Sequence, residues 1–189
     1  MPELWLIRHG ETAWSVSGRH TGRTDAPLTD EGRRRAAALG GLLRGHEFAQ
    51  VISSPLSRAR ETCLIAAPAG PLVLDEDLME WDYGRYEGLT TAEIRLREPG
   101  WTIWRDGVPG GETIDEVAMR ARRVIGRAAS AGGDVALFAH GHFLRVLAAC
   151  WLQLPPVDGC RLALGTASLS MLGHERETPV IIGWNLVSW

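Results

Sequence analysis

The stretch that decides the fold is Leu-Trp-Leu-Ile-Arg-His-Gly-Glu-Thr at residues 4–12. Its first part, Leu4 to Ile7, is an apolar run that predicts a short buried β-strand, and the run ends in Arg8 and His9. Buried strands usually end in turn-forming residues, so a guanidinium beside an imidazole indicates a role other than packing. Ligands of open α/β sheets bind at the carboxyl ends of strands, where this pair could hold and attack an anion. The alternative is a core histidine beside a surface arginine.

Size and charge restrict the classes of function. The chain has 189 residues and is 45% apolar, which is enough for one substantial core, so we expect a single domain over residues 1–189. Its net charge of −3 lacks the basic excess of proteins that bind nucleic acid or anionic membranes. All 20 basic residues are Arg, which excludes Schiff-base lysine chemistry and a P-loop lysine.

The cysteines and the apolar runs bear on the compartment. Cys63, Cys150 and Cys160 are far apart and form no Cys-x-x-Cys pair, which favours a reduced, cytoplasmic protein. The amino terminus has no basic segment followed by a long apolar run. No apolar stretch approaches the roughly 18 residues of a membrane span. We therefore expect neither secretion nor membrane association.

Short apolar runs alternate with capped amphipathic segments along the chain. This alternation is typical of βα units around a mostly parallel sheet, and it predicts an α/β fold. After Leu4 to Ile7, further strands are predicted at Val51 and Ile52, Val135 to Ala139, Ala167 to Leu172, and Val180 to Val187.

Helix starts are marked by capping residues. Thr29 predicts the N-cap of a helix that runs to about Arg44, and Ser54 with Pro55 predicts the N-cap and first residue of another, with Arg58 in its first turn. Two capping boxes predict two more helices, and a last helix is expected near Phe143. The boxes are Thr90 with Glu93 and Thr113 with Glu116.

Two predicted strands end in histidine followed by glycine, at His9-Gly10 and His140-Gly141. Parallel strands bring their carboxyl ends to one edge of a sheet, so we expect the two imidazoles to meet. Arg58 follows a third strand and can reach the same crevice, where helix amino termini add N–H donors for an anion. This arrangement predicts a phosphate-shaped site.

Six segments of the chain carry a family resemblance. They are Leu-Ile-Arg-His-Gly-Glu-Thr at 6–12, His-Thr-Gly-Arg-Thr-Asp-Ala-Pro-Leu-Thr at 20–29, Ser-Ser-Pro-Leu-Ser-Arg-Ala-Arg-Glu-Thr at 53–62, Glu-Trp-Asp-Tyr-Gly-Arg-Tyr-Glu-Gly at 80–88, Gly-Gly-Glu-Thr at 110–113 and Ala-His-Gly-His at 139–142. In this order they resemble the histidine phosphatase superfamily, in its phosphoglycerate mutase-like branch. The resemblance implies a three-layer α/β/α sandwich with a mostly parallel central sheet.

The resemblance also implies the roles of five catalytic residues. His9 matches the nucleophile that forms a phosphohistidine, and its other ring nitrogen is expected to meet a backbone carbonyl. Arg8, Arg58 and His140 match residues that bind the transferring phosphoryl group. Glu80 matches the carboxyl group that protonates the leaving oxygen and then deprotonates water.

A second group of residues is expected to bind substrate: Ser15, Thr21, Gly22, Gly141, His142, Trp104 and Arg105. Ser15 stands where many family members have Asn. For His142 a phosphate-loop role is favoured over a metal site, because no carboxylate or cysteine spacing completes such a site. We expect no metal and no cofactor.

Two features near the predicted pocket leave alternatives open. Trp81, Tyr83, Trp101 and Trp104 line a pocket or belong to the core. Arg19, Arg23 and Arg105 hold a second anionic group of the substrate or lie on an ordinary surface.

The closest resemblance is to a subgroup that contains bacterial acid phosphatases and a fungal sedoheptulose bisphosphatase. It implies a metal-independent acid phosphatase acting on small phosphomonoesters, sugar phosphates among them. The segment from Glu80 to His140 is compact compared with phosphoglycerate mutases, and an open pocket admits water to a phosphohistidine. The alternatives are mutase-type phosphotransfer and a non-catalytic binder of phosphorylated ligands. The expected partner is a small phosphorylated metabolite, and a homodimer is compatible with the sequence.

Overall fold

The two central strands of the sheet are apolar on both faces. In the computed structural model, which describes residues 2–187, β1 (Leu4–Arg8) pairs in parallel with β4 (Val135–Ala139). Leu6 packs into the core on one face of the sheet and Ile7 into the core on the other. Because successive side chains of a strand alternate between faces, a strand that is covered on both sides must be apolar throughout.

The sheet has six strands in the order β3-β2-β4-β1-β5-β6. β2 (Gln50–Ser53) and β3 (Leu72–Leu74) run parallel to β4, whereas β5 (Leu169–Glu175) is antiparallel to β1 and β6 (Thr178–Leu186) is antiparallel to β5. The prediction of a mostly parallel α/β sheet is confirmed. β3 was not predicted, because its three residues are all exposed and give no buried pattern.

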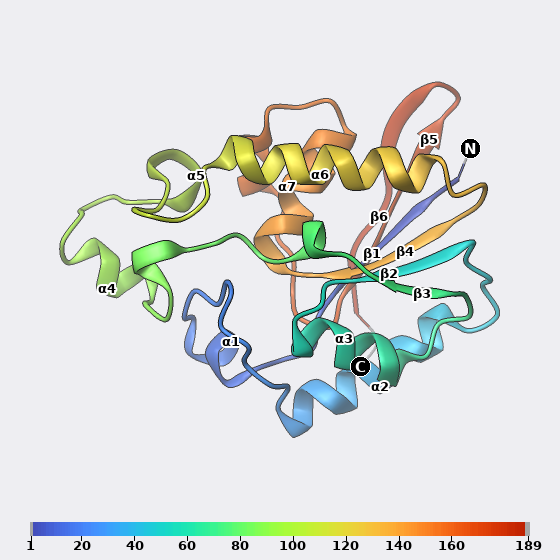
Figure 1. Cartoon of the computed structure of the whole chain (residues 1–189), viewed down its shortest axis with the longest axis horizontal. Helices are drawn as coiled ribbons and strands as arrows, with labels where there is room; N and C mark the ends of the chain where they lie inside the picture. Colours follow the sequence, from blue (N-terminus) through green and yellow to red (C-terminus); the bar gives the residue numbers. More distant parts are fainter. Residues whose placement is uncertain (1, 188–189) are drawn as a thin grey trace.

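Helices cover both faces of the sheet (Figure 1). On one side lie α2 (Asp30–Leu43) and α3 (Ser57–Ala66), which bury Leu39 and Cys63. On the other lie α6 (Ile114–Ala129) and α7 (Gly141–Trp151), which bury Val124 and Phe143. The structure is therefore the three-layer sandwich that the resemblance implies.

Most of the predicted helix starts are confirmed. The Thr29 hydroxyl accepts from Gly32 N at 3.0 Å at the start of α2. The boxes at Thr90 and Thr113 cap α4 (Thr91–Arg95) and α6. Fixed caps of this kind are worth about 1 kcal/mol each.

One predicted cap is wrong. α3 begins at Ser57 after Leu56, without a side-chain cap. The Ser54 hydroxyl accepts from Leu56 N at 3.3 Å, ahead of the helix, and it contacts His140 Nε2 at 2.9 Å, 86 positions away. The hydroxyl that the local pattern assigned to a helix cap thus also supports a distant histidine.

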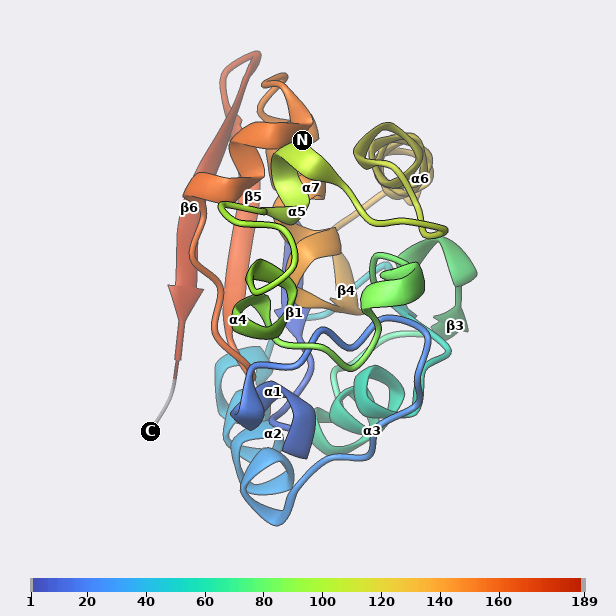
Figure 2. The same ribbon diagram turned by 90° about the vertical axis from the view of Figure 1, so that its left-hand side faces the viewer.

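The connections after the strand ends form a lobe at one side of the sheet (Figure 1; Figure 2 views it end-on). It contains α1 (Ala13–Ser17), η2 (Gly84–Tyr86), α4 and α5 (Ile103–Asp106), while η1 (Glu76–Leu78) precedes α4 and η3 (Pro156–Arg161) follows α7. Most of the segment Pro155 to Gly159 lies in η3, with Pro155 as the residue before the helix. None of the helices within residues 2–187 has the length and apolarity needed to cross a bilayer.

Candidate active site

His9 and His140 meet at the carboxyl edge of the sheet, as predicted. Each follows a parallel strand, and His9 N donates to Ala139 O at 3.0 Å, which ties the two strand ends together. Their ring centroids are 5.2 Å apart. Both side chains are buried, so the imidazoles form the floor of the site and not its surface.

The His9 ring is held in one orientation by its own turn. Its Nδ1 lies 2.7 Å from Gly10 O. A carbonyl oxygen can only accept, so Nδ1 carries the proton and Nε2 carries the lone pair. Burial, followed by the charges of Arg58 and Arg8, holds the pKa of His9 well below its usual range. His9 is therefore a neutral imidazole with one free basic nitrogen.

Two arginines, the half-buried Arg8 and the buried Arg58, flank the histidines. Arg8 Nη1 donates to Leu164 O. Arg58 is fully buried and donates to Thr24 O at 2.9 Å, Thr21 O at 3.1 Å and Gly22 O at 2.8 Å. Burial lowers the pKa of both guanidinium groups, and the Glu80 charge raises it. The loop of residues 21–24 thus holds the Nη groups of Arg58.

Three buried nitrogens beside His9 lack a hydrogen-bond partner: Arg8 Nε, Arg58 Nε and His140 Nδ1. Within residues 2–187 the other buried side-chain atom without a partner is His174 Nδ1. A buried polar group without a partner costs about 1–3 kcal/mol, so such groups are rare in folded proteins. Their concentration around one histidine marks a place that is built for an oxygen-rich ligand.

Glu80 lies at the amino end of α7. Its Oε1 accepts from Trp81 N and Phe143 N, both at 2.9 Å, and its Oε2 accepts from His142 N at 3.1 Å. The N-cap residue of this helix gives no side-chain cap, so Glu80 takes that place from a distant segment. The carboxylate is 5% exposed and faces the same pocket as His9.

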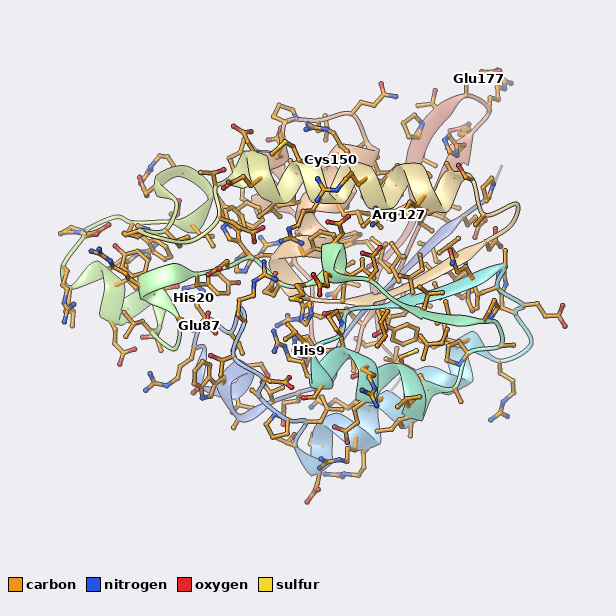
Figure 3. All side chains as sticks on the ribbon, in the orientation of Figure 1. His9, His20, Glu87, Arg127, Cys150 and Glu177 are labelled. Carbon is orange, nitrogen blue, oxygen red and sulfur yellow. The ribbon has the colours of Figure 1, made fainter. Side chains whose placement is uncertain are left out.

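The pocket in front of His9 has a volume of about 190 Å³. Figure 3 shows His9 near the strand ends and His20 further out, toward the lobe that carries α4. Among the predicted substrate-binding residues, Ser15, Thr21, Gly141 and His142 line it. The complete lining is Arg8, His9, Ser15, Gly18, Arg19, His20, Thr21, Glu80, Tyr83, Gly141, His142, Arg145 and Leu164.

Three of these lining residues are explained by their contacts. Ser15 Oγ accepts from Thr12 N at 2.9 Å and donates to Thr12 O at 2.8 Å, so it closes the capping box of α1. A side chain at Gly141 would place its Cβ 3.2 Å from Arg8 Cζ, so glycine lets the arginine approach the helix end. His142 Nδ1 lies 2.6 Å from the Tyr83 hydroxyl.

Three predicted substrate-binding residues lie elsewhere. Gly22 packs under Trp81 O and offers its carbonyl to Arg58, so it belongs to the support of that arginine. The Trp104 ring is covered by the Arg145 guanidinium at 4.6 Å and packs against the core. Arg105 pairs with its neighbour Asp106 on the surface. None of the three lines the pocket in front of His9.

Two supporting residues were not predicted. Ser54 holds His140 Nε2, and Glu87 accepts from Gly22 N at 2.9 Å and from Thr24 N at 3.0 Å. Glu87 thereby fixes the loop whose carbonyls hold Arg58. Both residues belong to motifs at 53–62 and 80–88, which was the signal available in the sequence. Within residues 2–187 no group of three His, Cys, Asp or Glu side chains is placed to hold a metal ion.

The fold and the site define an α/β enzyme with a buried, neutral histidine among anion-binding groups. The model of the histidine phosphatase superfamily (branch 1) matches residues 4–187, and the chain belongs to this superfamily. The resemblance of the motifs is thus confirmed.

Two curated relatives and one solved structure show the similarity over most of the chain. An acid phosphatase of Mycobacterium tuberculosis is 45% identical over 179 residues, covering 91% of this chain and 86% of the relative. The sedoheptulose 1,7-bisphosphatase of Saccharomyces cerevisiae is 38% identical over 191 residues, covering 84% and 70%. The structure of an open reading frame product of Mycobacterium tuberculosis matches with a TM-score of 0.93 and 41% identity, covering 98% of both chains. The expected enzyme class, a phosphatase, is confirmed.

Proposed function

We propose that this protein is a metal-independent acid phosphatase that hydrolyses small phosphomonoesters through a phosphohistidine on His9. The observation that carries the proposal is the environment of His9 Nε2. Its ring is oriented by Gly10 O, and the unpartnered nitrogens of Arg8, Arg58 and His140 lie beside it. A phosphoryl group there would satisfy those nitrogens while Nε2 attacks it.

In the first half-reaction, His9 Nε2 attacks phosphorus and forms the P–N bond, while the P–O ester bond breaks. The protonated form of Glu80 gives its proton to the leaving oxygen, so an alcohol departs. The guanidinium groups of Arg8 and Arg58 balance the charge on the phosphoryl oxygens. His9 Nδ1 keeps its proton, which is hydrogen-bonded to Gly10 O, and the phosphorylated ring carries a positive charge.

In the second half-reaction, water attacks phosphorus and the P–N bond breaks. Glu80, now a carboxylate, takes a proton from the water, and inorganic phosphate leaves. The backbone N–H groups of Trp81, His142 and Phe143 hold this carboxylate in place for both steps. His9 returns to its neutral state with Nε2 free.

The acid range of the proposed activity follows from the burial of the nucleophile. Burial and the two arginines hold the pKa of His9 well below 6.5, so Nε2 stays unprotonated in mildly acidic solution. An exposed histidine would lose its lone pair there. The cations of the site are arginines, which supply charge to the phosphoryl group without a metal ion.

The substrate class is proposed from the pocket and from relatives. A volume of about 190 Å³ fits a small phosphorylated metabolite and not a macromolecule. One relative is a sugar bisphosphatase, which brings sugar phosphates into the proposal. Cys63, Cys150 and Cys160 are free thiols, which suits a reducing, cytoplasmic compartment.

The test is hydrolysis of p-nitrophenyl phosphate in the presence of EDTA. We expect turnover that persists with the chelator and falls by about 10⁴-fold or more in His9→Ala. His174→Asn is the matched control, because that histidine lies against Trp151, away from the pocket, and we expect less than a twofold change. Alkaline quench should preserve a labelled phosphoenzyme that acid quench destroys. Turnover that needs a metal, or a phosphoenzyme that survives acid, would overturn the proposal.

Two further assays separate the alternatives, a mutase and a non-catalytic binder. Interconversion of 2- and 3-phosphoglycerate that is much faster than hydrolysis would indicate a mutase. Phosphate binding without turnover of any phosphomonoester would indicate a non-catalytic binder.

A further inference from the structure

The pocket contains a tyrosine–histidine pair that the proposed chemistry does not use. The Tyr83 hydroxyl lies 2.6 Å from His142 Nδ1, and both residues line the pocket. Tyr83 is 2% exposed and follows Glu80 by three positions, whereas His142 is the second residue of α7. The His20 ring packs on Tyr83 with its centroid at 4.9 Å.

The protons of this pair can be assigned. Burial, aided by the Glu80 charge, raises the pKa of Tyr83 well above 10, so the phenol keeps its proton. Burial, followed by the charge of Arg145, holds the pKa of His142 well below 6.5, so the imidazole is neutral. Among residues 2–187 the Tyr83 hydroxyl has no other hydrogen-bond partner, so its proton is paired only if it is donated to Nδ1, and the imidazole proton is then on Nε2. Tyr83 thereby selects one of the two neutral forms of His142.

The selected form offers an N–H donor to the pocket. Within residues 2–187, His142 Nε2 has no hydrogen-bond partner. It differs from the unpartnered His140 Nδ1 because it is not completely buried. It is therefore accessible from the pocket that His142 lines. The main-chain N–H of the same residue holds Glu80 Oε2 at 3.1 Å, so the imidazole stands on the leaving-group side of His9.

The neighbouring charges indicate which oxygen this donor meets. Arg19 bonds to Gly88 O and pairs with Glu93 at 3.6 Å. Arg145 donates to Gly159 O and Cys160 O and stacks on Trp104. Arg19 uses one Nη group in these contacts, and Arg145 uses Nε and one Nη group. The donor that His142 adds to the pocket is an uncharged N–H group, and such a donor suits a neutral oxygen such as a hydroxyl.

We propose that Tyr83 is a positioning residue that fixes His142 as an N–H donor to a hydroxyl oxygen near the phosphoester, so that the site favours polyol phosphates. The proposal rests on the proposed phosphatase function for its substrate. Glu80 protonates the leaving oxygen, and His142 binds the hydroxyl on the adjoining carbon. A substrate without that hydroxyl leaves the Nε2 proton unpaired.

The kinetic test compares glycerol 1-phosphate with n-propyl phosphate, which differ only in hydroxyl groups. Tyr83→Phe removes the phenol proton and leaves the ring in place. We expect kcat/KM for glycerol 1-phosphate to fall about 10-fold and kcat/KM for n-propyl phosphate to change less than twofold. Tyr86→Phe is the matched control, because its hydroxyl bonds to Glu98 on the surface. Equal losses on both substrates, or a loss in the control alone, would overturn the proposal.

A rescue variant separates positioning from general damage. In His142→Gln the side-chain amide places an N–H group where Nε2 stood, without a tautomer to select. We expect Tyr83→Phe to cost less than twofold on glycerol 1-phosphate in that background. A full 10-fold loss there would show that Tyr83 does not act through His142.

A measurement without turnover tests the tautomer itself. Two-bond ¹⁵N–¹H correlations of histidine distinguish a proton on Nδ1 from one on Nε2. We expect the Nε2–H form for His142 in the unmodified protein and a mixture in Tyr83→Phe. Predominance of the Nδ1–H form in the unmodified protein would refute the inference even if the enzyme is a phosphatase. If no phosphomonoester is hydrolysed, the proposed function fails while the tautomer result still stands.

Discussion

The sheet carries a cluster of histidines and polar groups at each of its two ends, and the clusters differ in how their polar atoms are satisfied. At the amino ends of the strands, His46 Nε2 contacts Asp134 Oδ2 at 2.9 Å, and Asp134 Oδ1 accepts from Glu3 N at 2.8 Å. The Trp5 ring packs on His46 and donates its N–H to Glu3. This cluster finds its partners within the chain.

At the carboxyl ends, the partners are incomplete. His9 and His140 are more deeply buried than His46. Even so, one side-chain nitrogen in each of Arg8, Arg58 and His140 has no hydrogen-bond partner. The same residue types therefore serve two purposes. Paired groups hold the sheet together, whereas unpaired ones cost stability and are retained where a ligand completes them. Three predictions test this contrast.

The largest effect is expected from Arg58, whose charge acts on both site histidines. Arg58→Ala should lower kcat/KM by about 10³-fold, because one preorganised donor at a developing charge supplies about that much. Steady-state kinetics with p-nitrophenyl phosphate measures the loss. Arg60→Ala, an exposed arginine two positions along the same helix, is the control and should change it less than twofold.

Arg58 also holds three loop carbonyls, so its removal could act through folding. Thermal unfolding of each variant resolves this. A folded Arg58→Ala protein with nearly full activity would show that the unpartnered groups at the carboxyl ends of the strands do not serve a ligand. Arg58→Lys keeps the charge without the fork of donors, and we expect an intermediate activity.

The second prediction concerns pH. Burial holds the pKa values of His9, His140 and His142 well below 6.5 and that of His20 at about 4. The unfolded chain binds these protons near pH 6.5 and the folded chain does not, so the free energy of unfolding falls as the pH drops below 6.5. Each histidine contributes a slope that approaches about 1.4 kcal/mol per pH unit.

Urea unfolding at pH 7.5, 6.5 and 5.5 measures this slope. We expect a modest fall between the first two, because the unfolded histidines are half protonated at pH 6.5, and a steeper fall toward pH 5.5, where most carboxylates are still ionised. His20→Asn should reduce the slope by the contribution of one histidine, up to about 1.4 kcal/mol per pH unit. A stability that is flat or rises between pH 6.5 and 5.5 would show that the site histidines are not buried in the neutral form.

The strand ends and the capping boxes were within reach of the sequence, because they depend on short patterns. An apolar run that stops at His9 or His140 marks a strand end, and parallel pairing then brings the two together. Thr113 and Glu116 meet because they are three positions apart at the start of a helix. Where one residue spacing determines the contact, the prediction was correct.

The remaining features depend on partners that lie far apart in the chain. Ser54 contacts a histidine 86 positions away, and Tyr83 contacts one 59 positions away. For Arg105 the sequence left a substrate contact and a surface position open, and the structure pairs it with its neighbour Asp106 on the surface. Local patterns identify which groups carry charge but not which partner each group meets. The partner decides whether a residue belongs to the active site or to the structure that supports it.

The smallest effect is expected at the amino ends of the strands. Asp134→Ala removes the acceptor of both Glu3 N and His46 Nε2, two half-buried hydrogen bonds. We expect the free energy of unfolding to fall by about 1–2 kcal/mol, because each net hydrogen bond contributes about 1 kcal/mol. The kinetics should not change, since no residue of this cluster lines the pocket. Urea unfolding and kcat/KM are measured on the same preparation, and a loss of activity in Asp134→Ala would mean that the two ends of the sheet are coupled.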